Sequence, residues 1–197
     1  MTRPLLRALD RSLLEQPAHE VAPQLLNLLI ACGERVGRIV EVEAYGGTDD
    51  PASHAHRGPT PRAAIMFDRP GLLYVYRSYG VHWCANVVAH RPSEVGAVLI
   101  RAIEPIAGLE QMWAARPAAR RPQDLGSGPG KLCQALGIND EHLGTDLLEP
   151  GAAVRLVRDG ADPPAHPVIG TRIGISVGLD HPWRFSVPGS CHRSRRW

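Results

Sequence analysis

Two glutamates and a tyrosine alternate with apolar residues in the run Glu41-Val-Glu-Ala-Tyr45. Successive side chains of a β-strand point to opposite faces, so Glu41, Glu43 and Tyr45 would share one face. A carboxylate held there could accept a proton from water and stabilise a developing positive charge. The spacing alone is more typical of a solvated surface strand, so the neighbouring residues have to decide between the two interpretations.

The residues that follow this run are rich in titratable groups. After two glycines come four such side chains: Asp49, Asp50, His54 and His56. Titratable groups beside a strand end and a flexible loop resemble a site more than a solvated face. His54 and His56 with a carboxylate could bind zinc, which leaves a metal-dependent hydrolase as an alternative. No third ligand is evident, because His82 and Cys84 belong to a separate predicted strand, and we expect no metal site.

A predicted β-hairpin, with strands over residues 72–77 and 81–88, carries several aromatic side chains. Tyr79 falls at its tip, where its own sheet cannot pack it, so we expect it to be exposed or in contact with a partner. Tyr74 and Tyr76 share a face, which core packing would also explain. Asn86 lies among apolar strand residues, where a buried amide needs hydrogen-bond partners or faces a ligand.

Arg101 interrupts the apolar strand run Val98–Ile103. An arginine in such a strand lies either on a solvated face or opposite an anion, such as a DNA phosphate or a site carboxylate. Both interpretations stay open from the sequence.

A second group of cations surrounds a glycine-rich segment. Lys131 is the only lysine and follows Gly126-Ser-Gly-Pro-Gly130, whose backbone N–H groups could bind a phosphate at a helix start. The spacing does not fit a P-loop. Arg116, Arg120 and Arg121 precede it and suit contacts with a nucleic-acid backbone, or a solvated loop. A single lysine also disfavours Schiff-base chemistry, which needs an amine nucleophile.

The elements that must position these residues mix helices and strands without regular βαβ alternation. Helices are predicted at 20–31 (ending at Gly33), from Thr60-Pro61, at 105–115 and from Gly128-Pro129 to 136; strands at 36–43, 72–77, 81–88, 95–103, 153–158, 170–176 and 183–187; and a loop at 116–130. We therefore predict an α+β fold: a curved, largely antiparallel sheet surrounded by helices, with a protruding hairpin that carries Tyr79. Residues 1–190 would form one domain and residues 191–197 a flexible tail.

The whole chain sets further bounds. Its 197 residues suit one domain, and its net charge of +2 permits nucleic-acid binding without requiring it. Four scattered cysteines fit neither a disulfide framework nor a zinc ribbon. The N-terminus lacks the apolar core of a signal peptide, and the longest apolar run, residues 25–32, is too short to cross a membrane. We expect a cytoplasmic protein that does not enter membranes.

Several segments in one order carry a specific resemblance. They are Ile39–Tyr45, Ala52-Ser-His54, Thr60-Pro-Arg62, Met66-Phe67, Pro70–Tyr76, Tyr79-Gly80, Asn86, Leu99–Pro105, Gly128–Leu132 and Arg184-Phe185. Together they resemble the alkyladenine (3-methyladenine) DNA glycosylase family, the type without a helix-hairpin-helix, over roughly residues 3–190. The resemblance implies a monofunctional hydrolase that flips alkylated or deaminated purines out of duplex DNA, with no lyase activity and no metal or other cofactor. A monomer is the default expectation.

The resemblance also implies roles at the bond that is cleaved. Glu43 holds the place of the general base that activates water, and Arg101 that of an arginine near this water. A backbone carbonyl that orients the water would fall near Ile173.

Other roles concern the damaged base. The resemblance places Tyr45 on one side of the flipped base and His54 with Tyr76 on the other. Asn86 would exclude guanine through its 2-amino group, and Tyr79 would fill the gap left in the duplex. Lys131, Arg120 and Arg121 remain candidates for DNA-backbone contacts.

Two departures and one alternative remain. Val81 and His82 stand beside Tyr79 where the family often has larger apolar or aromatic residues, and residues 188–194 lack the family's usual Gly-Ser-Pro ending. A non-catalytic DNA-binding protein of the same fold is the alternative, although Glu43 in place argues against it.

Overall fold

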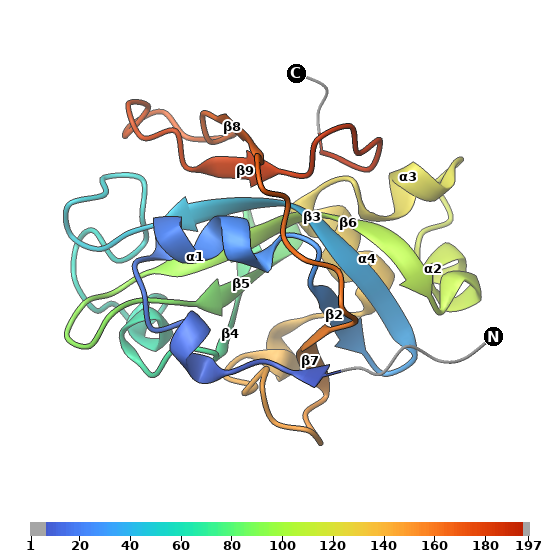
Figure 1. Ribbon diagram of the computed structural model, residues 1–197, viewed down its shortest axis with the longest axis horizontal. Coiled ribbons are helices and arrows are strands. Elements are labelled where there is room, and N and C mark those ends of the chain that lie inside the picture. The colour runs from blue at the N-terminus through green and yellow to red at the C-terminus, as the bar shows by residue number, and fades with distance from the viewer. Residues whose placement is uncertain (1–6, 195–197) are drawn as a thin grey trace.

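A twisted antiparallel sheet crosses the centre of the molecule (Figure 1). The structure is a computed structural model that describes residues 7–194. Within that range the sheet has nine strands: β1 (Arg7–Ala8), β2 (Leu29–Cys32), β3 (Arg35–Tyr45), β4 (Leu73–Ser78), β5 (His82–Val88), β6 (Ala97–Ala107), β7 (Val154–Arg158), β8 (Val168–Gly170) and β9 (Arg184–Ser186). Their order is β1-β7-β2-β3-β6-β5-β4, with β9 beside β3 and β8 beside β9, and every pair is antiparallel.

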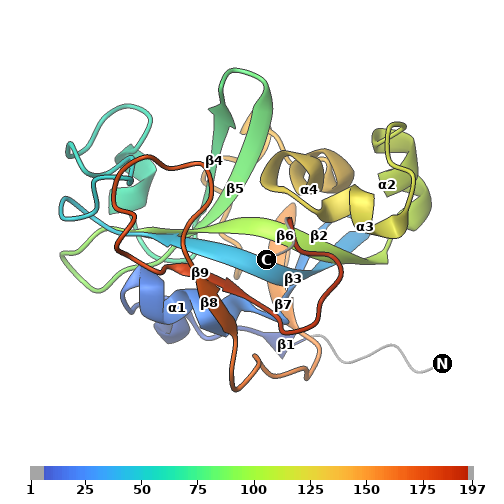
Figure 2. The same cartoon turned by 90° about the horizontal axis from the view of Figure 1, so that it is seen from above.

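Helices cover both faces of this sheet, as Figure 2 shows. On one face lies α1 (Ala18–Leu25); on the other lie α2 (Leu109–Ala115), α3 (Pro122–Gly126) and α4 (Pro129–Leu136). Short 3-10 helices occur at Arg11–Leu13, Ala64–Phe67 and Asp140–His142. Leu25 of α1 and Leu132 of α4 are fully buried, and burying a leucine completely contributes about 1.5–3 kcal/mol. The predicted α+β fold with a largely antiparallel sheet is confirmed.

The β4–β5 hairpin projects from the sheet on the side of α4 (Figure 2). Ser78 pairs with His82, so three residues make the turn, and Tyr79 (φ 49°) and Gly80 (φ 67°) adopt the left-handed conformation. Gly80 tolerates this conformation readily, whereas a tyrosine does so at a cost of about 1–3 kcal/mol. The predicted protruding hairpin with Tyr79 at its tip is confirmed.

The predicted helix over residues 20–31 is wrong in its second half. The helix α1 ends at Leu25, Asn27 takes a φ of 67°, and Leu29–Cys32 return as strand β2 against β3. This strand is buried along its whole length, and an apolar run buried on both faces has no periodicity that separates strand from helix. Gly33 (φ 58°) therefore lies in a hairpin turn and does not end a helix.

Three other boundaries also differ from the predictions. Strand β6 continues to Ala107, which pairs with Val36 of β3, so the helix predicted at 105–115 begins only at Leu109. The predicted loop at 116–130 contains α3, whose first turn has Pro122 and a capping carboxylate from Asp124. The strand predicted at 170–176 is instead β8, which ends at Gly170 because residues 171–183 leave the sheet as a long loop.

Two further findings concern the part of the chain that the structure describes. No helix within residues 7–194 is long and apolar enough to cross a membrane. The four cysteines are free, with Cys191 exposed and the other three buried.

Candidate active site

The face of β3 that carries Glu41, Glu43 and Tyr45 is buried, so the solvated-strand interpretation is wrong. The exposed fraction of Glu43 is 0% and that of Glu41 is 1%. The two glutamates and the tyrosine do share a face, because the Tyr45 hydroxyl donates to Glu43 Oε2 at 2.9 Å and Arg101 contacts both carboxylates. The chain after β8 folds back onto this face, which local sequence patterns do not reveal.

Three hydrogen-bond donors surround the Glu43 carboxylate. Nη1 of Arg101 lies 3.1 Å from Oε2, and the backbone N–H of Ile173 donates to Oε1 at 2.6 Å; the Tyr45 hydroxyl is the third. Burial raises the pKa of Glu43, and the charge of Arg101 with the hydrogen bonds from Ile173, Tyr45 and Arg101 opposes that rise. Such a carboxylate takes up a proton more readily than an exposed one, which suits a general base.

Arg101 therefore faces site carboxylates and does not lie on a solvated face. Its exposed fraction is 7%, and its Nε lies 3.6 Å from Glu41 Oε1. Glu41 also lies 3.5 Å from Nη1 of Arg184 and accepts hydrogen bonds from the backbone and hydroxyl of Ser194. Of the predicted tail, residues 191–194 are thus described, with Ser194 against Glu41, and residues 195–197 lie outside the described residues.

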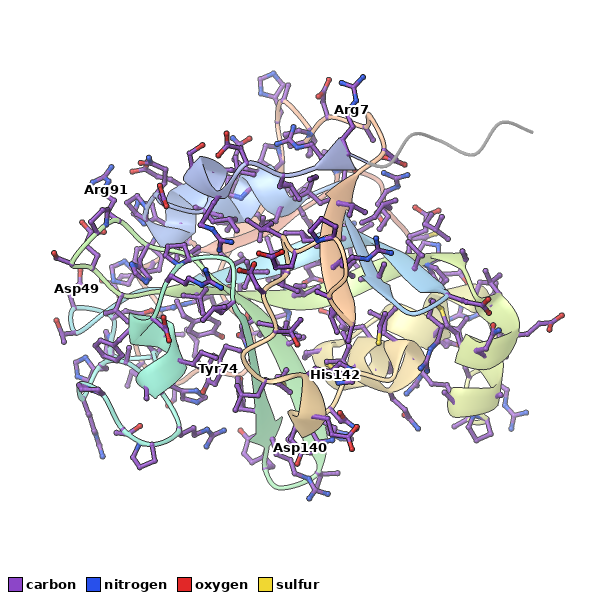
Figure 3. The ribbon with its side chains drawn as sticks, turned by 90° about the horizontal axis from the view of Figure 1, so that it is seen from below. Arg7, Asp49, Tyr74, Arg91, Asp140 and His142 are labelled. Carbon is purple, nitrogen blue, oxygen red and sulfur yellow. The ribbon has the colours of Figure 1, made fainter. Side chains whose placement is uncertain are left out.

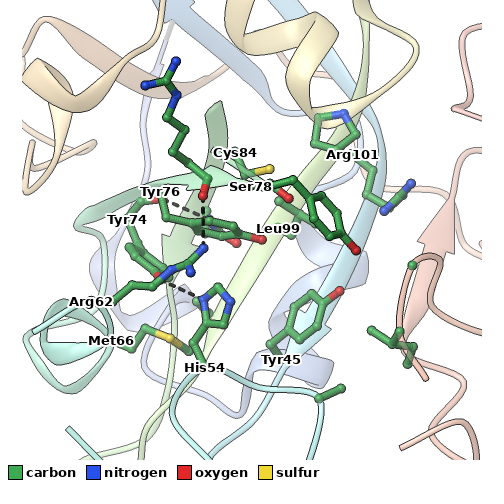
Figure 4. A pocket seen from close by; sticks show the side chains of 18 of the residues that line it. Tyr45, His54, Arg62, Met66, Tyr74, Tyr76, Ser78, Cys84, Leu99 and Arg101 are labelled. Atoms are coloured by element: carbon green, nitrogen blue, oxygen red, sulfur yellow. Dashed lines mark hydrogen bonds between the residues drawn. The ribbon is translucent and has the colours of Figure 1, made fainter. Parts of the chain in front are cut away.

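A cavity of about 620 Å³ opens beside this carboxylate (Figure 4), within the usual range of about 300–1,000 Å³ for small-ligand sites. It brings together the side chains predicted for base recognition, and its lining includes Tyr45, His54, Tyr76, Asn86, Arg101 and Ile173. Three of these, Tyr45, Arg101 and Ile173, are the hydrogen-bond partners of Glu43. The carboxylate consequently lies behind the cavity wall.

Aromatic rings form much of that wall. The ring centroids of His54 and Tyr76 are 4.6 Å apart with an interplanar angle of 75°, and those of Tyr74 and Tyr76 are 5.3 Å apart. Tyr74 is buried inside the molecule near the base of the hairpin, whereas the titratable Asp49 is exposed at the periphery of the molecule (Figure 3). Flat aromatic surfaces next to a carboxylate suit a planar heterocycle.

Two polar side chains in the cavity have defined environments. His54 Nδ1 lies 2.8 Å from the Tyr74 hydroxyl, and partial burial followed by the charge of Arg62 lowers the pKa of His54. The lowered pKa favours the neutral form of the His54 ring. Asn86 is 3% exposed and donates through Nδ2 to the carbonyl of Tyr74 at 3.0 Å, which fixes its amide at the cavity wall.

Tyr79 is the most prominent side chain beside the cavity. It lines the rim and is 93% exposed, as its place at the hairpin tip predicts. Val81, on the other side of Gly80, is 63% exposed.

The predicted backbone-binding cations lie outside the cavity. Lys131 is exposed, and its Nζ lies 3.2 Å from the Ser127 hydroxyl. It follows by two residues Pro129, which lines the cavity. Arg120 and Arg121 are exposed near the start of α3, where Arg121 forms an ion pair of 3.1 Å with Asp124. Arg116 donates to Gln134 at 2.7 Å.

His54 and His56 contact different groups and do not converge. His56 Nδ1 lies 2.6 Å from the carbonyl of Thr48, whereas His54 faces Tyr74. Between residues 7 and 194 no three His, Cys, Asp or Glu side chains are grouped as metal ligands would be.

Local sequence patterns miss three residues of the site: Arg62, Arg172 and Trp183. The guanidinium of Arg62 lies 4.7 Å from the Tyr76 ring centroid. Arg172 is buried against Tyr45 and Trp183. An arginine in an irregular loop has no periodicity that marks it as buried, so only the resemblance pointed to this stretch, through Ile173.

Comparisons with known proteins agree with this geometry. The model of the family described as methylpurine-DNA glycosylase (MPG) matches residues 12–191. A protein of Burkholderia lata named "Putative 3-methyladenine DNA glycosylase" is 52% identical over 183 residues, which cover 92% of this chain and 88% of that protein. Proteins of the same name from Nitrobacter winogradskyi (45% identical, 93% and 86% covered) and Frankia casuarinae (46% identical, 89% and 86% covered) are also similar.

These matches define the class of the protein: it is a DNA glycosylase, a hydrolase that acts in base excision repair. Within that class the chain belongs to the methylpurine-DNA glycosylase family.

Proposed function

We propose that this glycosylase flips a damaged purine from duplex DNA into the aromatic cavity and hydrolyses its N-glycosidic bond with a water that Glu43 activates. One observation carries the proposal: the groups that hold the Glu43 carboxylate, namely Tyr45, Arg101 and Ile173, are also lining residues of the cavity. A base bound in the cavity would place its glycosidic carbon next to these three groups and the Glu43 carboxylate that they hold.

Base flipping explains the exposed hairpin tip. A purine inside a duplex is out of reach, and extruding it costs a few kcal/mol. A ring inserted into the gap restores stacking worth about 1–3 kcal/mol. Tyr79 is 93% exposed beside the cavity, so its ring can enter the duplex without leaving a packed core.

Base recognition would depend on the cavity walls. Tyr45 on one side and His54 with Tyr76 on the other offer aromatic surfaces to the purine. An alkylated purine is cationic, and its attraction to aromatic faces contributes about 0.5–2 kcal/mol. Asn86, fixed by its bond to Tyr74, would exclude guanine by its 2-amino group.

In the hydrolysis step the water oxygen bonds to the glycosidic carbon and Glu43 accepts the proton of the water. The carbon–nitrogen bond breaks, and its electron pair leaves with the purine. The charge of Arg101 favours the ionised form of Glu43, and the ionised carboxylate would stabilise the cationic sugar as the base departs. Three donors occupy the Glu43 carboxylate, which has about four acceptor sites, so a water that enters from the cavity would donate to the remaining one.

The remaining features follow from the same proposal. Lys131, Arg120 and Arg121 would contact DNA phosphates, and the enzyme would act as a monomer in the bacterial cytoplasm. Lyase activity is not expected, because Lys131 is the only lysine and is not among the residues that line the cavity.

The direct test is incubation with duplexes that carry one defined lesion, 3-methyladenine, 7-methylguanine, hypoxanthine or ethenoadenine, and detection of the free base by chromatography. Release of a damaged purine that persists in EDTA, with an intact DNA strand before alkali treatment, is expected. Activity abolished by EDTA would favour the metal-dependent alternative with His54 and His56, and binding without any base release would favour the non-catalytic one.

A further inference from the structure

Arg172 and Asp50 form a buried ion pair next to the site that no role in the proposed chemistry accounts for. Both side chains are 0% exposed. Nη1 of Arg172 lies 2.6 Å from Asp50 Oδ2, and Nη2 lies 2.9 Å from Oδ1, so the pair is bidentate. Burying two charges costs several kcal/mol per ion and is offset only by excellent geometry and additional hydrogen bonds. A pair retained at that cost suggests a requirement at this position.

The additional hydrogen bonds connect segments that are far apart in the sequence. Arg172 also donates to the carbonyl of Ala44 at 3.1 Å and to that of Gly178 at 3.2 Å. Asp50 accepts from the backbone N–H groups of Gly46 at 2.9 Å and Ala52 at 3.1 Å. One guanidinium thus ties the end of β3, the loop that carries His54 and the loop 171–183 to each other.

Two aromatic rings complete the environment of this guanidinium. Its Cζ lies 4.8 Å from the ring centroid of Tyr45 and 5.3 Å from that of Trp183. Cation–π contacts of this kind contribute about 0.5–2 kcal/mol and fix the orientation of the ring. The ring of Tyr45 therefore has one face against Arg172, and its hydroxyl points to Glu43.

We propose that Arg172, locked by Asp50, is the positioning residue that holds the Glu43 carboxylate in its reactive orientation. It acts through two neighbours: Tyr45, which it contacts directly, and Ile173, which follows it in the chain and donates to Glu43 at 2.6 Å. Two of the three hydrogen bonds to Glu43 consequently depend on the Arg172 anchor, and the third comes from Arg101. This inference rests on the proposed role of Glu43.

The arrangement has a measurable consequence for the titration of Glu43. The charged groups that face Glu43 are Arg101 from β6 and Arg184 from β9. The hydrogen bonds from Ile173 and Tyr45 both lower the pKa of Glu43 against the effect of burial. If the Arg172 anchor is released, these hydrogen bonds weaken, and the pKa of Glu43 rises further.

The test uses Arg172→Lys and Asp50→Asn in the full chain, with Trp183→Leu as a milder variant that removes only one ring. The controls are Arg38→Lys and Asp159→Asn, because Arg38 and Asp159 also form a bidentate pair (2.6 and 3.2 Å), less deeply buried, toward the other end of β3. Near-UV circular dichroism establishes the temperature at which each variant is folded. Single-turnover release of a neutral lesion base is then measured across pH, together with the Kd for undamaged duplex.

In folded variants at Asp50 or Arg172 the rate is expected to fall about ten- to hundredfold, while the Kd for undamaged duplex stays constant. The rate should fall at low pH as Glu43 becomes protonated, and we call this part of the rate profile its acidic limb. The midpoint of this limb should move to higher pH by about half a pH unit or more, with a smaller shift in Trp183→Leu. The controls should keep the wild-type rate and midpoint. A reduced rate with an unmoved midpoint, or an unchanged rate, in folded Arg172→Lys or Asp50→Asn overturns the inference.

Glu43→Gln separates this outcome from failure of the proposed function. If the acidic limb persists in Glu43→Gln, the limb does not report Glu43 and the proposed function itself fails. If the limb disappears in Glu43→Gln but does not move in Asp50→Asn, only the positioning role of Arg172 is lost.

Discussion

Nη1 of Arg101 lies 3.1 Å from Oε2 of Glu43, and both side chains are buried. Each charge is therefore compensated chiefly by the other and by a small set of neighbours, among which Glu41 lies 3.6 Å from Arg101. A buried general base needs a balance between burial, which raises its pKa, and a neighbouring cation, which lowers it. Burial favours the protonated form of Glu43, and the charge of Arg101 opposes that effect.

Arg101→Gln is expected to lower both the rate of base release and the stability of the fold. Breaking one partner of a buried pair costs about 3–5 kcal/mol, because the other charge stays buried. The pKa of Glu43 should rise, so the acidic limb of the rate profile should move to higher pH. Denaturant unfolding and single-turnover kinetics measure the two effects. Arg38→Gln serves as the control, and an unmoved limb in folded Arg101→Gln would argue against the pairing.

Tyr79→Ala should impair base flipping with little effect on stability. The side chain is 93% exposed, and exposed substitutions usually change stability by about 0.5 kcal/mol or less. Loss of the ring removes a stacking contribution of about 1–3 kcal/mol in the gapped duplex. Fluorescence of 2-aminopurine beside a lesion reports flipping, with Tyr79→Phe as a control that keeps the ring. Equal fluorescence changes in Tyr79→Ala and the wild type would remove the assignment.

Asn86→Ser should relax the exclusion of normal guanine. The shorter side chain leaves room for a 2-amino group and gives up the fixed amide that now bonds to Tyr74. Release of free guanine from undamaged duplex is the measurement, compared with release of hypoxanthine, which lacks that amino group. If guanine release does not increase relative to hypoxanthine release, Asn86 has no discriminating role.

The raised pKa of Glu43 predicts opposite effects of pH on rate and on stability. The rate should rise with pH through a midpoint above the ordinary glutamate value of 4.5, because only the carboxylate accepts a proton. In the same window the folded state holds more protons than the unfolded chain, so the contribution of Glu43 to the free energy of unfolding decreases as pH rises. Urea unfolding of the wild type and Glu43→Gln should therefore diverge as pH rises above 4.5. Parallel curves would contradict the raised pKa.

The fold and the site were predictable from sequence to different degrees. Alternation placed Glu41, Glu43 and Tyr45 on one face of β3, and turn residues placed Tyr79 at a hairpin tip. Both features depend on local geometry, which the sequence encodes within a few residues. The strand β2 was missed because burial along its whole length removes the periodic signal.

The burial of Glu43 was less accessible to sequence reasoning. Its partners come from β6 and from residue 173, which is 130 positions later in the chain. Whether this face of β3 is buried or exposed to solvent therefore depends on contacts between distant parts of the sequence. Arg172 illustrates the same limit, since its partner Asp50 is 122 positions away. The resemblance to a family predicted that these segments belong to one site, and the structure shows the hydrogen bonds between them.

The most direct test of the account is the single-turnover rate of base release by Glu43→Gln on a duplex with one lesion. Glutamine keeps the size of the side chain and cannot accept the proton of water, so the rate should fall by about 10²–10⁴-fold while the Kd for the lesion duplex stays within about threefold, roughly 0.7 kcal/mol. A rate within a few-fold of the wild type would contradict the role of Glu43 as the base.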